Sequence, residues 1–470
     1  MQMEGRHSTL TLGFVPTRRQ VFSRDEALKF KRLTLQAIGS YPVRIMDIDW
    51  LNDDGLLYDP ADVSKVVERF SRSGIDALFI PHCNFGAEDA VGALAGALRK
   101  PVLLWGPRDE EPLADGTRLR DTQCGLFASS KALRRVGVPF SYIVNCRVDD
   151  LEFREGFSTF LSAVSVKKSL ENLVIGQIGT RPRGFWTVMA NEGELLERFG
   201  IRIEPLTVSE LASMVNQVLQ SDEYRERIKE ELSSIASRFE TSHLTTEELN
   251  VTVALKLALS RWAASIGASA IALQCWTALQ QELGIMPCFV NGELTAEGLP
   301  VACETDIHGA ISSVMLQAAA MHATPPFLAD LTVRHPTNDN AELLWHCGNF
   351  PWALRDESDS RGAKLERHSL FLDKRPIVGE WRLKSGDLTV CRFDADHGEY
   401  SLLIGEGRST DGPMTRGTYV WLEVDDWPRW ERRIIEGPYI HHVAVTYARV
   451  AKALVEACRF IPGLKADQMD

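Results

Sequence analysis

Strand-like and helix-like segments alternate along the first part of the chain, and this alternation constrains the fold more than any other feature. The segments follow one another as strand 8–16, helix 24–39, strand 43–51, helix 60–74, strand 75–82, helix 87–98 and strand 100–106. Such a pattern predicts a parallel sheet with right-handed crossovers. Ligands of these sheets bind beyond the carboxyl ends of the strands, so the segments that follow each strand are candidate site loops.

The same alternation starts again after residue 170. A strand with a glycine-rich turn at 171–186 is followed by a helix, a second strand and another helix up to residue 220. A polar helical stretch then leads into the apolar segment 251–276, which we predict to be one buried helix. Lys256 and Arg261 within it argue against a membrane span. The pattern predicts a second α/β domain.

After about Pro325 the helical periodicity fades. Short β-rich segments follow, separated by turn residues, at 327–333, 341–348, 379–396, 399–407 and 416–424. This spacing favours an antiparallel barrel or sandwich, with a final helix predicted at 441–460. We therefore predict an α/β fold class with two Rossmann-like, doubly wound domains (1–140 and 141–325) and a mostly antiparallel β domain (326–470) that carries a terminal helix.

Charge and cysteine content narrow the partners and the compartment. The formal net charge of −12 argues against nucleic acid or an anionic membrane as a partner. The N-terminal apolar stretch is too short for a signal peptide. Nine cysteines without a C-x-x-C motif suit reduced, buried thiols better than a disulfide framework. We expect a soluble, cytoplasmic enzyme.

One stretch, "VACETDIHGAISSVMLQ" at 301–317, places two acids and a histidine ahead of an apolar run. Asp306 suits the N-cap of a helix that begins near Ile307. Glu304 is harder to explain, because it follows what we interpret as the end of a buried strand. A buried carboxylate without a partner is costly, so the pattern predicts that Glu304 has one.

Later segments offer possible partners for Glu304. Asp330 interrupts the apolar run "FLADL", His346 ends "LLWH", and His441 and His442 lie in "GPYIHHVAV". Two carboxylates with one or two imidazoles form a credible ligand set for Mn²⁺ or a similar divalent cation. Each residue taken alone also has a structural explanation, as a strand-edge acid or a capping histidine.

These residues carry a resemblance to a known family. "CETDIHGA" followed by "FLADL", "HCG" and a late "HHVAV" resembles the L-fucose isomerase and L-arabinose isomerase family, and Asp330 is more similar to the fucose isomerase branch. The segments "DTQCGL" (121–126) and "VIGQIGTRPRGF" (174–185) also look like turns of that family's second domain. The predicted architecture agrees with the family's, so the resemblance spans nearly the whole chain.

The resemblance implies a metal site. Glu304 and Asp330 would bind Mn²⁺ and exchange substrate protons, and His442, in preference to His441, would complete the metal shell. The resemblance also implies a homo-oligomer, either a trimer or a hexamer.

The resemblance and the chain pattern together suggest four substrate contacts. Arg18 follows the first strand and is a candidate for a sugar hydroxyl or an acid group, although a surface charge explains it equally well. Gln274 is a candidate by analogy, with helix packing as the alternative. His346 matches an extra histidine of the arabinose isomerases, and His441 adjoins the expected ligand.

The implied function is a metal-dependent aldose–ketose isomerase that acts on a monosaccharide through an enediolate. No nucleotide or organic cofactor is expected, because the chain has neither a G-x-G-x-x-G nor a G-K-[ST] motif. Two alternatives remain: an enzyme of the same fold that performs carbon–carbon cleavage, transfer or epimerisation on a modified sugar, and a non-catalytic sugar-binding relative. The sequence leaves the identity of the sugar open.

Overall fold

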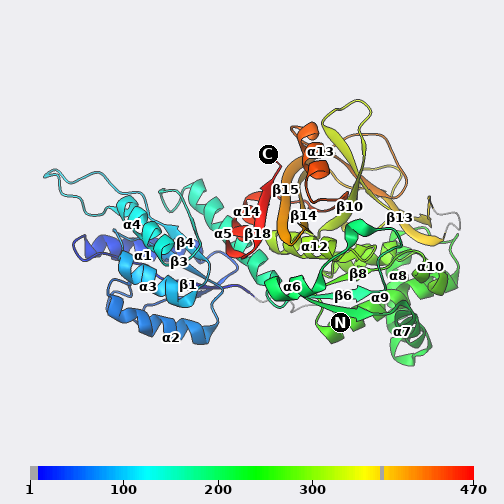
Figure 1. Cartoon of the computed structure of the whole chain (residues 1–470), viewed down its shortest axis with the longest axis horizontal. Helices are drawn as coiled ribbons and strands as arrows, with labels where there is room; N and C mark the ends of the chain where they lie inside the picture. The colour runs from blue at the N-terminus through cyan, green and yellow to red at the C-terminus, as the bar shows by residue number, and fades with distance from the viewer. Residues whose placement is uncertain (1–8, 371–374, 470) are drawn as a thin grey trace. The chain divides into compact units, whose positions relative to one another are not determined.

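The computed structural model describes residues 9–370 and 375–469. The chain divides into two compact units, Met1–Lys168 and Ser169–Asp470, with the boundary in the last turn of a helix. Figure 1 shows parallel strands flanked by helices in the first unit, and a second α/β layer with a β-rich layer in the second unit. This arrangement confirms the predicted fold class.

The first unit is a parallel five-stranded sheet in the order β2-β1-β3-β4-β5. Its strands are β1 (Thr11–Phe14), β2 (Arg44–Met46), β3 (Ala77–Pro81), β4 (Val102–Trp105) and β5 (Phe140–Tyr142). Its helices are α1 (Arg24–Ile38), α2 (Val63–Ser73), α3 (Glu88–Leu98), α4 (Thr122–Arg135) and α5 (Leu151–Leu170). The strand order reverses direction at β1 and β3, which is where ligands of such sheets bind.

Single residues explain where α1 begins and where α2 ends. Ser23 caps α1 by accepting a hydrogen bond from the backbone N–H of Glu26. Gly74 ends α2 in the left-handed conformation, at φ 62°, which glycine adopts without a steric penalty. The buried face of α2 belongs to the same hydrophobic cluster as β3, all five residues of which are buried.

The second unit begins with a parallel four-stranded sheet in the order β7-β6-β8-β9. Its strands are β6 (Val174–Ile178), β7 (Arg202–Leu206), β8 (Ala270–Leu273) and β9 (Val301–Cys303). The accompanying helices are α6 (Glu192–Phe199), α7 (Val208–Gln220), α8 (Arg225–Arg238), α9 (Thr246–Ile266), α10 (Ala278–Leu283), α11 (Cys288–Ala296) and α12 (Ile307–Ala319).

The rest of the second unit is a mostly antiparallel nine-stranded sheet in the order β12-β13-β16-β11-β10-β17-β14-β15-β18. The strands are β10 (Phe327–Arg334), β11 (Ala341–His346), β12 (Lys364–Arg367), β13 (Pro376–Arg382), β14 (Asp387–Asp396), β15 (Glu399–Thr410), β16 (Thr418–Glu423), β17 (His442–Thr446) and β18 (Leu464–Gln468). Two helices, α13 (Trp427–Glu436) and α14 (Ala451–Phe460), complete it. A further pairing between β15 and β16 closes six of the strands into a barrel.

Helix α12 joins the two layers of the second unit. All of its residues are buried, because it packs against β8 and β9 of the parallel sheet and against β17 and β14 of the barrel. Figure 1 shows α12 at the base of the β-rich layer. The N-terminus of this helix therefore brings the ends of both sheets together.

Three local predictions were wrong. Residues 442–446, predicted as the start of a helix, form the buried strand β17 between β10 and β14, and only α14 is helical. The apolar segment 251–276 is not one helix, because Gly267 ends α9 and β8 follows. The segment 121–126 is no turn of the second domain, since it begins α4 in the first unit.

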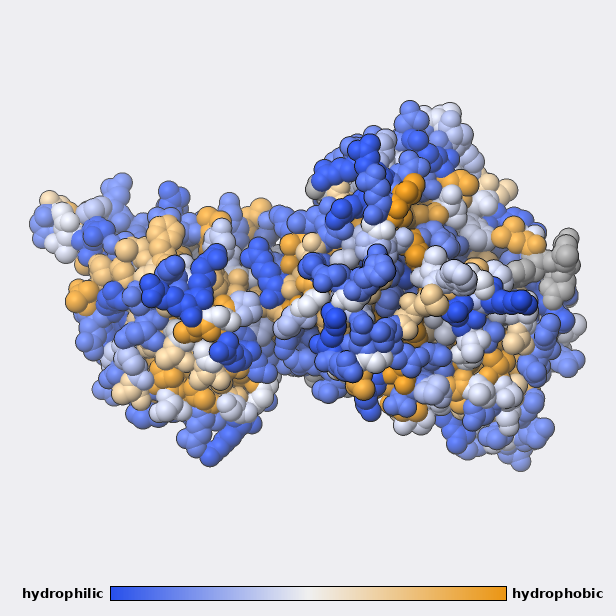
Figure 2. Space-filling view, viewed as in Figure 1, coloured by the Kyte–Doolittle hydropathy of each residue, from blue (hydrophilic) through white to orange (hydrophobic). Residues whose placement is uncertain are grey.

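The described residues contain no helix that is both long and apolar enough to cross a membrane. Hydrophilic side chains cover much of the face shown in Figure 2. All nine cysteines are free thiols, and most of them are buried.

Candidate active site

The chain turns sharply where β9 meets α12. Glu304 and Thr305 both adopt the left-handed backbone region, at φ 61° and 56°. Residues other than glycine rarely adopt this conformation, which persists where the surrounding structure enforces it and is common at active sites. Here the Thr305 N–H donates to the Leu273 carbonyl at 3.1 Å, and Asp306 caps α12 by accepting from the Gly309 N–H at 2.9 Å. The turn holds the Glu304 side chain at the carboxyl edge of the parallel sheet.

Asp330 and His442 lie on neighbouring strands of the barrel. They are register partners in the antiparallel pair of β10 and β17, and residues directly opposite each other in such a pair project to the same face. His442 Nε2 lies 3.5 Å from Asp330 Oδ1 and 3.1 Å from Glu304 Oε2. Three residues that are far apart in the sequence therefore converge on one point.

The donor atoms at this point fit a divalent cation. His442 Nε2 and Asp330 Oδ1 are buried and have no hydrogen-bond partner among the described residues. His441, Asp330 and His442 can each direct one ligand atom so that these atoms lie within 4.8 Å of one another. Two carboxylates and one or two imidazoles suit Mn²⁺ or a similar ion. An ion bound by these atoms would supply the partners that the buried nitrogen and oxygen otherwise lack.

A buried charge network lies behind His442. The Asp306 carboxylate accepts a hydrogen bond from His442 Nδ1 at 2.9 Å and forms an ion pair with Arg392, whose side chain is fully buried. Arg392 Nε also donates to Asp394 at 2.8 Å, and Asp394 contacts His308 at 3.0 Å. Because a carboxylate only accepts, the proton of the neutral imidazole is held on Nδ1, which leaves Nε2 free for a ligand.

The same network determines the charge states at the site. Burial alone would raise the pKa of Asp306, but Arg392 and His442 outweigh it and hold that pKa well below its usual range. Burial likewise opposes ionisation of Glu304, yet His442 keeps its pKa below normal. Burial lowers the pKa of His442, but the neighbouring carboxylates of Asp306 and Glu304 prevail and raise it to about 10. Both carboxylates are therefore ionised at neutral pH.

A residue that follows strand β8 of the parallel sheet also contacts the site. The Trp276 indole N–H donates to Glu304 Oε1 at 3.1 Å, which leaves Oε2 directed at His442. Gln274 makes no hydrogen bond to Glu304, Asp330 or His442 within the described residues. Its Oε1 accepts from the Thr180 N–H at 3.0 Å and so holds the loop that follows β6.

The structure places the other predicted residues as follows. His346 is buried at the end of β11, with Nδ1 accepting from the Cys347 N–H at 2.8 Å and Nε2 without a hydrogen-bond partner among the described residues. His441 is exposed beside His442. Arg18 belongs to the first unit, where it pairs with Asp54 at 2.9 Å and lies over the Tyr58 ring.

Sequence reasoning missed two residues and understated a third. Asp306 was explained as a helix cap alone, but it also binds His442 and Arg392. Arg392 carried a usable signal, since it is a charged residue inside the apolar run "LTVCRF", the same anomaly that pointed to Glu304. Trp276 carried no comparable signal, because a tryptophan after a buried strand is ordinary in a core.

Two regions of the chain match models of one protein family. Residues 13–171 match the family model described as "Fucose/sulfoquinovose isomerase, N-terminal domain", and residues 344–467 match "L-fucose isomerase, C-terminal domain". The sulfoquinovose isomerase of Alkalicoccus urumqiensis is 25% identical over 452 residues, which cover 96% of this chain and 97% of that protein.

Other relatives are also named sulfoquinovose isomerases. The sulfoquinovose isomerase of Priestia aryabhattai is 23% identical over 468 residues, covering 96% of this chain and 97% of that protein. That of Clostridium sp. (strain MSTE9) is 28% identical over 319 residues, covering 67% and 68%. Among solved structures, a periplasmic solute binding protein from Actinobacillus succinogenes 130z is 10% identical, covers 67% of this chain and 92% of that one, and aligns with a TM-score of 0.17, which is too low to carry an argument. The two family models and the full-length relatives show that the chain is a divergent member of the fucose isomerase-like family and that it is an isomerase.

Proposed function

We propose that this chain is a divalent-metal-dependent aldose–ketose isomerase whose substrate is a six-carbon sugar that carries a sulfonate. The names of the full-length relatives support the substrate class. The convergence of Glu304, Asp330 and His442 on one point is the observation that carries the metal and the chemistry.

Glu304, Asp330 and His442 would hold the ion, and Mn²⁺ is the metal that we expect. A divalent ion bound there would polarise the substrate carbonyl and stabilise the negative charge of an enediolate. Asp306 keeps the Nδ1 proton of His442 in place, so that Nε2 faces the two carboxylates.

Glu304 and Asp330 would also move the proton between C1 and C2 of the sugar. Both side chains are largely shielded from water, with exposed fractions of 10% and 19%, which suits general acid–base transfer within a closed site. The Trp276 N–H holds one oxygen of Glu304 and leaves the other oriented toward the site. The isomerisation needs no organic cofactor.

Further parts of the proposal rest on the family resemblance. Gln274, His346 and His441 are proposed substrate contacts in the second unit, and Arg18 is proposed as a contact supplied by a neighbouring subunit. We propose that the protein works in the cytoplasm as a homo-oligomer, either a trimer or a hexamer.

Metal content tests the proposal most directly. Elemental analysis of the purified protein before and after chelation should find a divalent ion near one per chain. Re-addition of Mn²⁺ should raise the thermal stability, because an ion that binds only the folded chain stabilises it by mass action. Glu304→Gln should lose the ion while keeping the circular dichroism spectrum of the wild type. A chain that neither retains a divalent ion nor gains stability from Mn²⁺ would contradict the proposal.

Turnover is tested by following sulfoquinovose by NMR. The expected product is the 2-keto sugar, with solvent deuterium entering at the carbon that receives the proton. Fragments of the carbon chain would instead indicate carbon–carbon cleavage, and a C2 epimer would indicate epimerisation.

A further inference from the structure

The loop that follows β6, residues 179–189, borders the candidate active site. Its Thr180 carbonyl accepts a hydrogen bond at 3.1 Å from Oγ1 of Thr305, the residue that follows Glu304 in the chain. Its Phe185 ring meets the Trp276 ring edge-on, with centroids 5.0 Å apart. A side chain at Gly179 (φ 71°) would collide with Gln274, so glycine permits the close approach of loop and strand. This loop is fastened to the site at several points.

Two arginines on this loop have no carboxylate partner among the residues that the structure describes. Arg181 is half-buried, and its guanidinium donates to the Phe185 carbonyl at 3.3 Å, which leaves most of its N–H groups available. Arg183 is exposed and makes no ion pair or hydrogen bond within residues 9–370 and 375–469. Since the Phe185 ring touches Trp276, whose indole binds Glu304, two residues connect the Arg181 guanidinium to the metal-ligand candidate.

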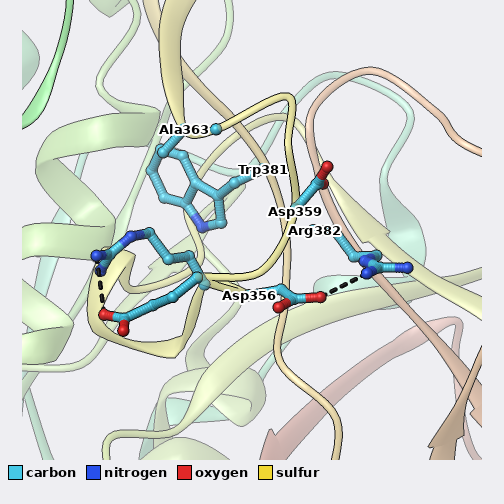
Figure 3. Close-up of a pocket in the computed structure, with 8 residues that line it drawn as sticks. Asp356, Asp359, Ala363, Trp381 and Arg382 are labelled. Carbon is cyan, nitrogen blue, oxygen red and sulfur yellow. Dashed lines mark hydrogen bonds and ion pairs between the residues drawn. The ribbon is translucent and has the colours of Figure 1, made fainter.

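Three other arginines of the second unit are each paired with a carboxylate. Arg392 is bound by Asp306 and Asp394 behind His442. In the barrel pocket shown in Figure 3, Arg382 pairs with Asp356, and Arg355 pairs with Glu357 at 2.9 Å. An anion entering these places would have to compete with a carboxylate, whereas at the loop it would not.

We propose that Arg181 and Arg183 form the subsite that binds the anionic end of the substrate, the sulfonate on C6 of the sugar. This inference rests on the proposed function, in which C1 and C2 lie at Glu304, Asp330 and His442. The loop then meets the opposite end of the same molecule.

The chemistry of the sulfonate and of the arginine guanidinium groups supports this pairing. A sulfonate is a strong acid and stays ionised, with three acceptor oxygens, at any pH at which the protein is folded. A guanidinium presents planar, bidentate donors and is always charged, so it suits such an oxyanion. When a sugar without the sulfonate is bound, these arginines would remain hydrated, so its binding would carry no penalty. The subsite would therefore select the charged sugar by added affinity and would not exclude the neutral one.

The test compares two sugars that differ only at C6. Steady-state kinetics of Arg181→Gln, Arg183→Gln and the double variant are measured with sulfoquinovose and with quinovose, its sulfonate-free counterpart. We expect kcat/KM for sulfoquinovose to fall about 10-fold in each single variant and about 100-fold in the double variant, as for lost hydrogen bonds to a charged group. The loss should appear mainly in KM, and kcat/KM for quinovose should not change.

A binding measurement separates recognition from turnover. Calorimetry with methyl sulfoquinovoside, which cannot open and isomerise, should show the same weakening in the double variant. The matched control is Arg202→Gln, which removes one exposed positive charge where β7 begins, at the opposite edge of the same sheet. This control should behave as wild type with both sugars.

The outcomes distinguish the subsite from the function. A double variant that keeps wild-type kcat/KM on sulfoquinovose, or an equal loss in Arg202→Gln, overturns the subsite and leaves the proposed function standing. A wild type that neither isomerises nor binds the sulfonated sugars overturns both.

Discussion

Two buried histidines, one in each unit, differ in the groups that surround them. His82 follows β3 in the first unit, with Nε2 at 2.8 Å from Ser129 Oγ and Nδ1 near the Ile80 carbonyl. Burial lowers its pKa to about 4. His442 is equally buried, but Asp306 and Glu304 overcome burial and raise its pKa to about 10. Carboxylate neighbours, and not burial, separate the structural histidine from the candidate ligand.

The edges of the two parallel sheets differ in the same way. In the first unit the Asn84 amide donates to the Arg19 and Ser23 carbonyls, and Asp54 is bound by Arg18 and Arg24. Acids and amides there satisfy neighbouring groups. In the second unit His442 Nε2 and Asp330 Oδ1 are buried and have no hydrogen-bond partner among the described residues, and the two atoms lie 3.5 Å apart. In the first unit Arg18 Nε and Asp109 Oδ1 also lack a hydrogen bond within these residues, but their side chains are paired with Asp54 and Arg120. Two unfilled positions that face each other, and not the number of polar residues, mark the site.

The largest expected effect on turnover comes from neutralising the two carboxylates that converge at the sheet edge of the second unit. Glu304→Gln and Asp330→Asn should each lower kcat by about 10³-fold or more, because each removes a proton-transfer group and a proposed metal ligand. Initial rates with sulfoquinovose measure this, and circular dichroism checks the fold.

The matched control for these variants is Glu342→Gln in the same barrel. Glu342 is a buried carboxyl whose pKa burial raises to about 7, so its amide resembles the protonated form and turnover should persist. Near wild-type activity in Glu304→Gln or Asp330→Asn would remove the catalytic assignment.

Arg392→Met should destabilise the fold strongly. It leaves Asp306 and Asp394 buried without their cation, and breaking a buried pair in this way costs about 3–5 kcal/mol. Urea unfolding of the metal-free protein gives the value. Arg408→Met removes an arginine from neighbouring β15, where its partner Glu423 lies at 2.9 Å near the surface, and should change stability little. Equal losses of stability in both variants would show that the buried ion pairs of Arg392 contribute no more than an ion pair near the surface.

The two histidines should give pH dependences of opposite sign in the metal-free protein. The folded pKa of His82 lies below its unfolded value, so its contribution to stability is present above pH 6.5 and is lost as pH falls toward 4. The folded pKa of His442 lies above its unfolded value, so its contribution is full below pH 6.5 and is lost as pH rises toward 10.

For one titrating histidine, the free energy of unfolding changes by at most about 1.4 kcal/mol per pH unit. Urea unfolding of the wild type, His82→Gln and His442→Gln at several pH values, with a chelator present, isolates each slope by difference. Slopes of the same sign would show that the carboxylates do not distinguish the two histidines.

The smallest expected effect concerns Trp276. Trp276→Phe keeps an aromatic ring against Phe185 but removes the N–H that binds Glu304. A single hydrogen bond to a charged group is worth about 1.5–3 kcal/mol, so we expect kcat to fall about 10-fold with little change in thermal stability. Unchanged kcat would mean that the turn at Glu304 orients this carboxylate without help from the indole.

Two of the residues that the structure brings together at the candidate site conflict with their own surroundings in the sequence. Glu304 and Asp330 each break an apolar run, and that local conflict is visible without a structure. The partnership of Asp306 with Arg392 and His442 was not visible, because these contacts span 86 and 136 positions. The strand 442–446 was missed for another reason: a short apolar run fits a strand or a buried helix equally well until its neighbours are known.

The three converging side chains also make the site a late event in folding. They come from the end of the parallel sheet, from β10 and from β17, and they meet only after the barrel has closed and packed against α12. Contacts between such distant segments form slowly, because long loops must close first. A chain with a misplaced final strand would lack His442 at the site and would not retain the ion. The metal content of a preparation would therefore count the chains that have finished folding.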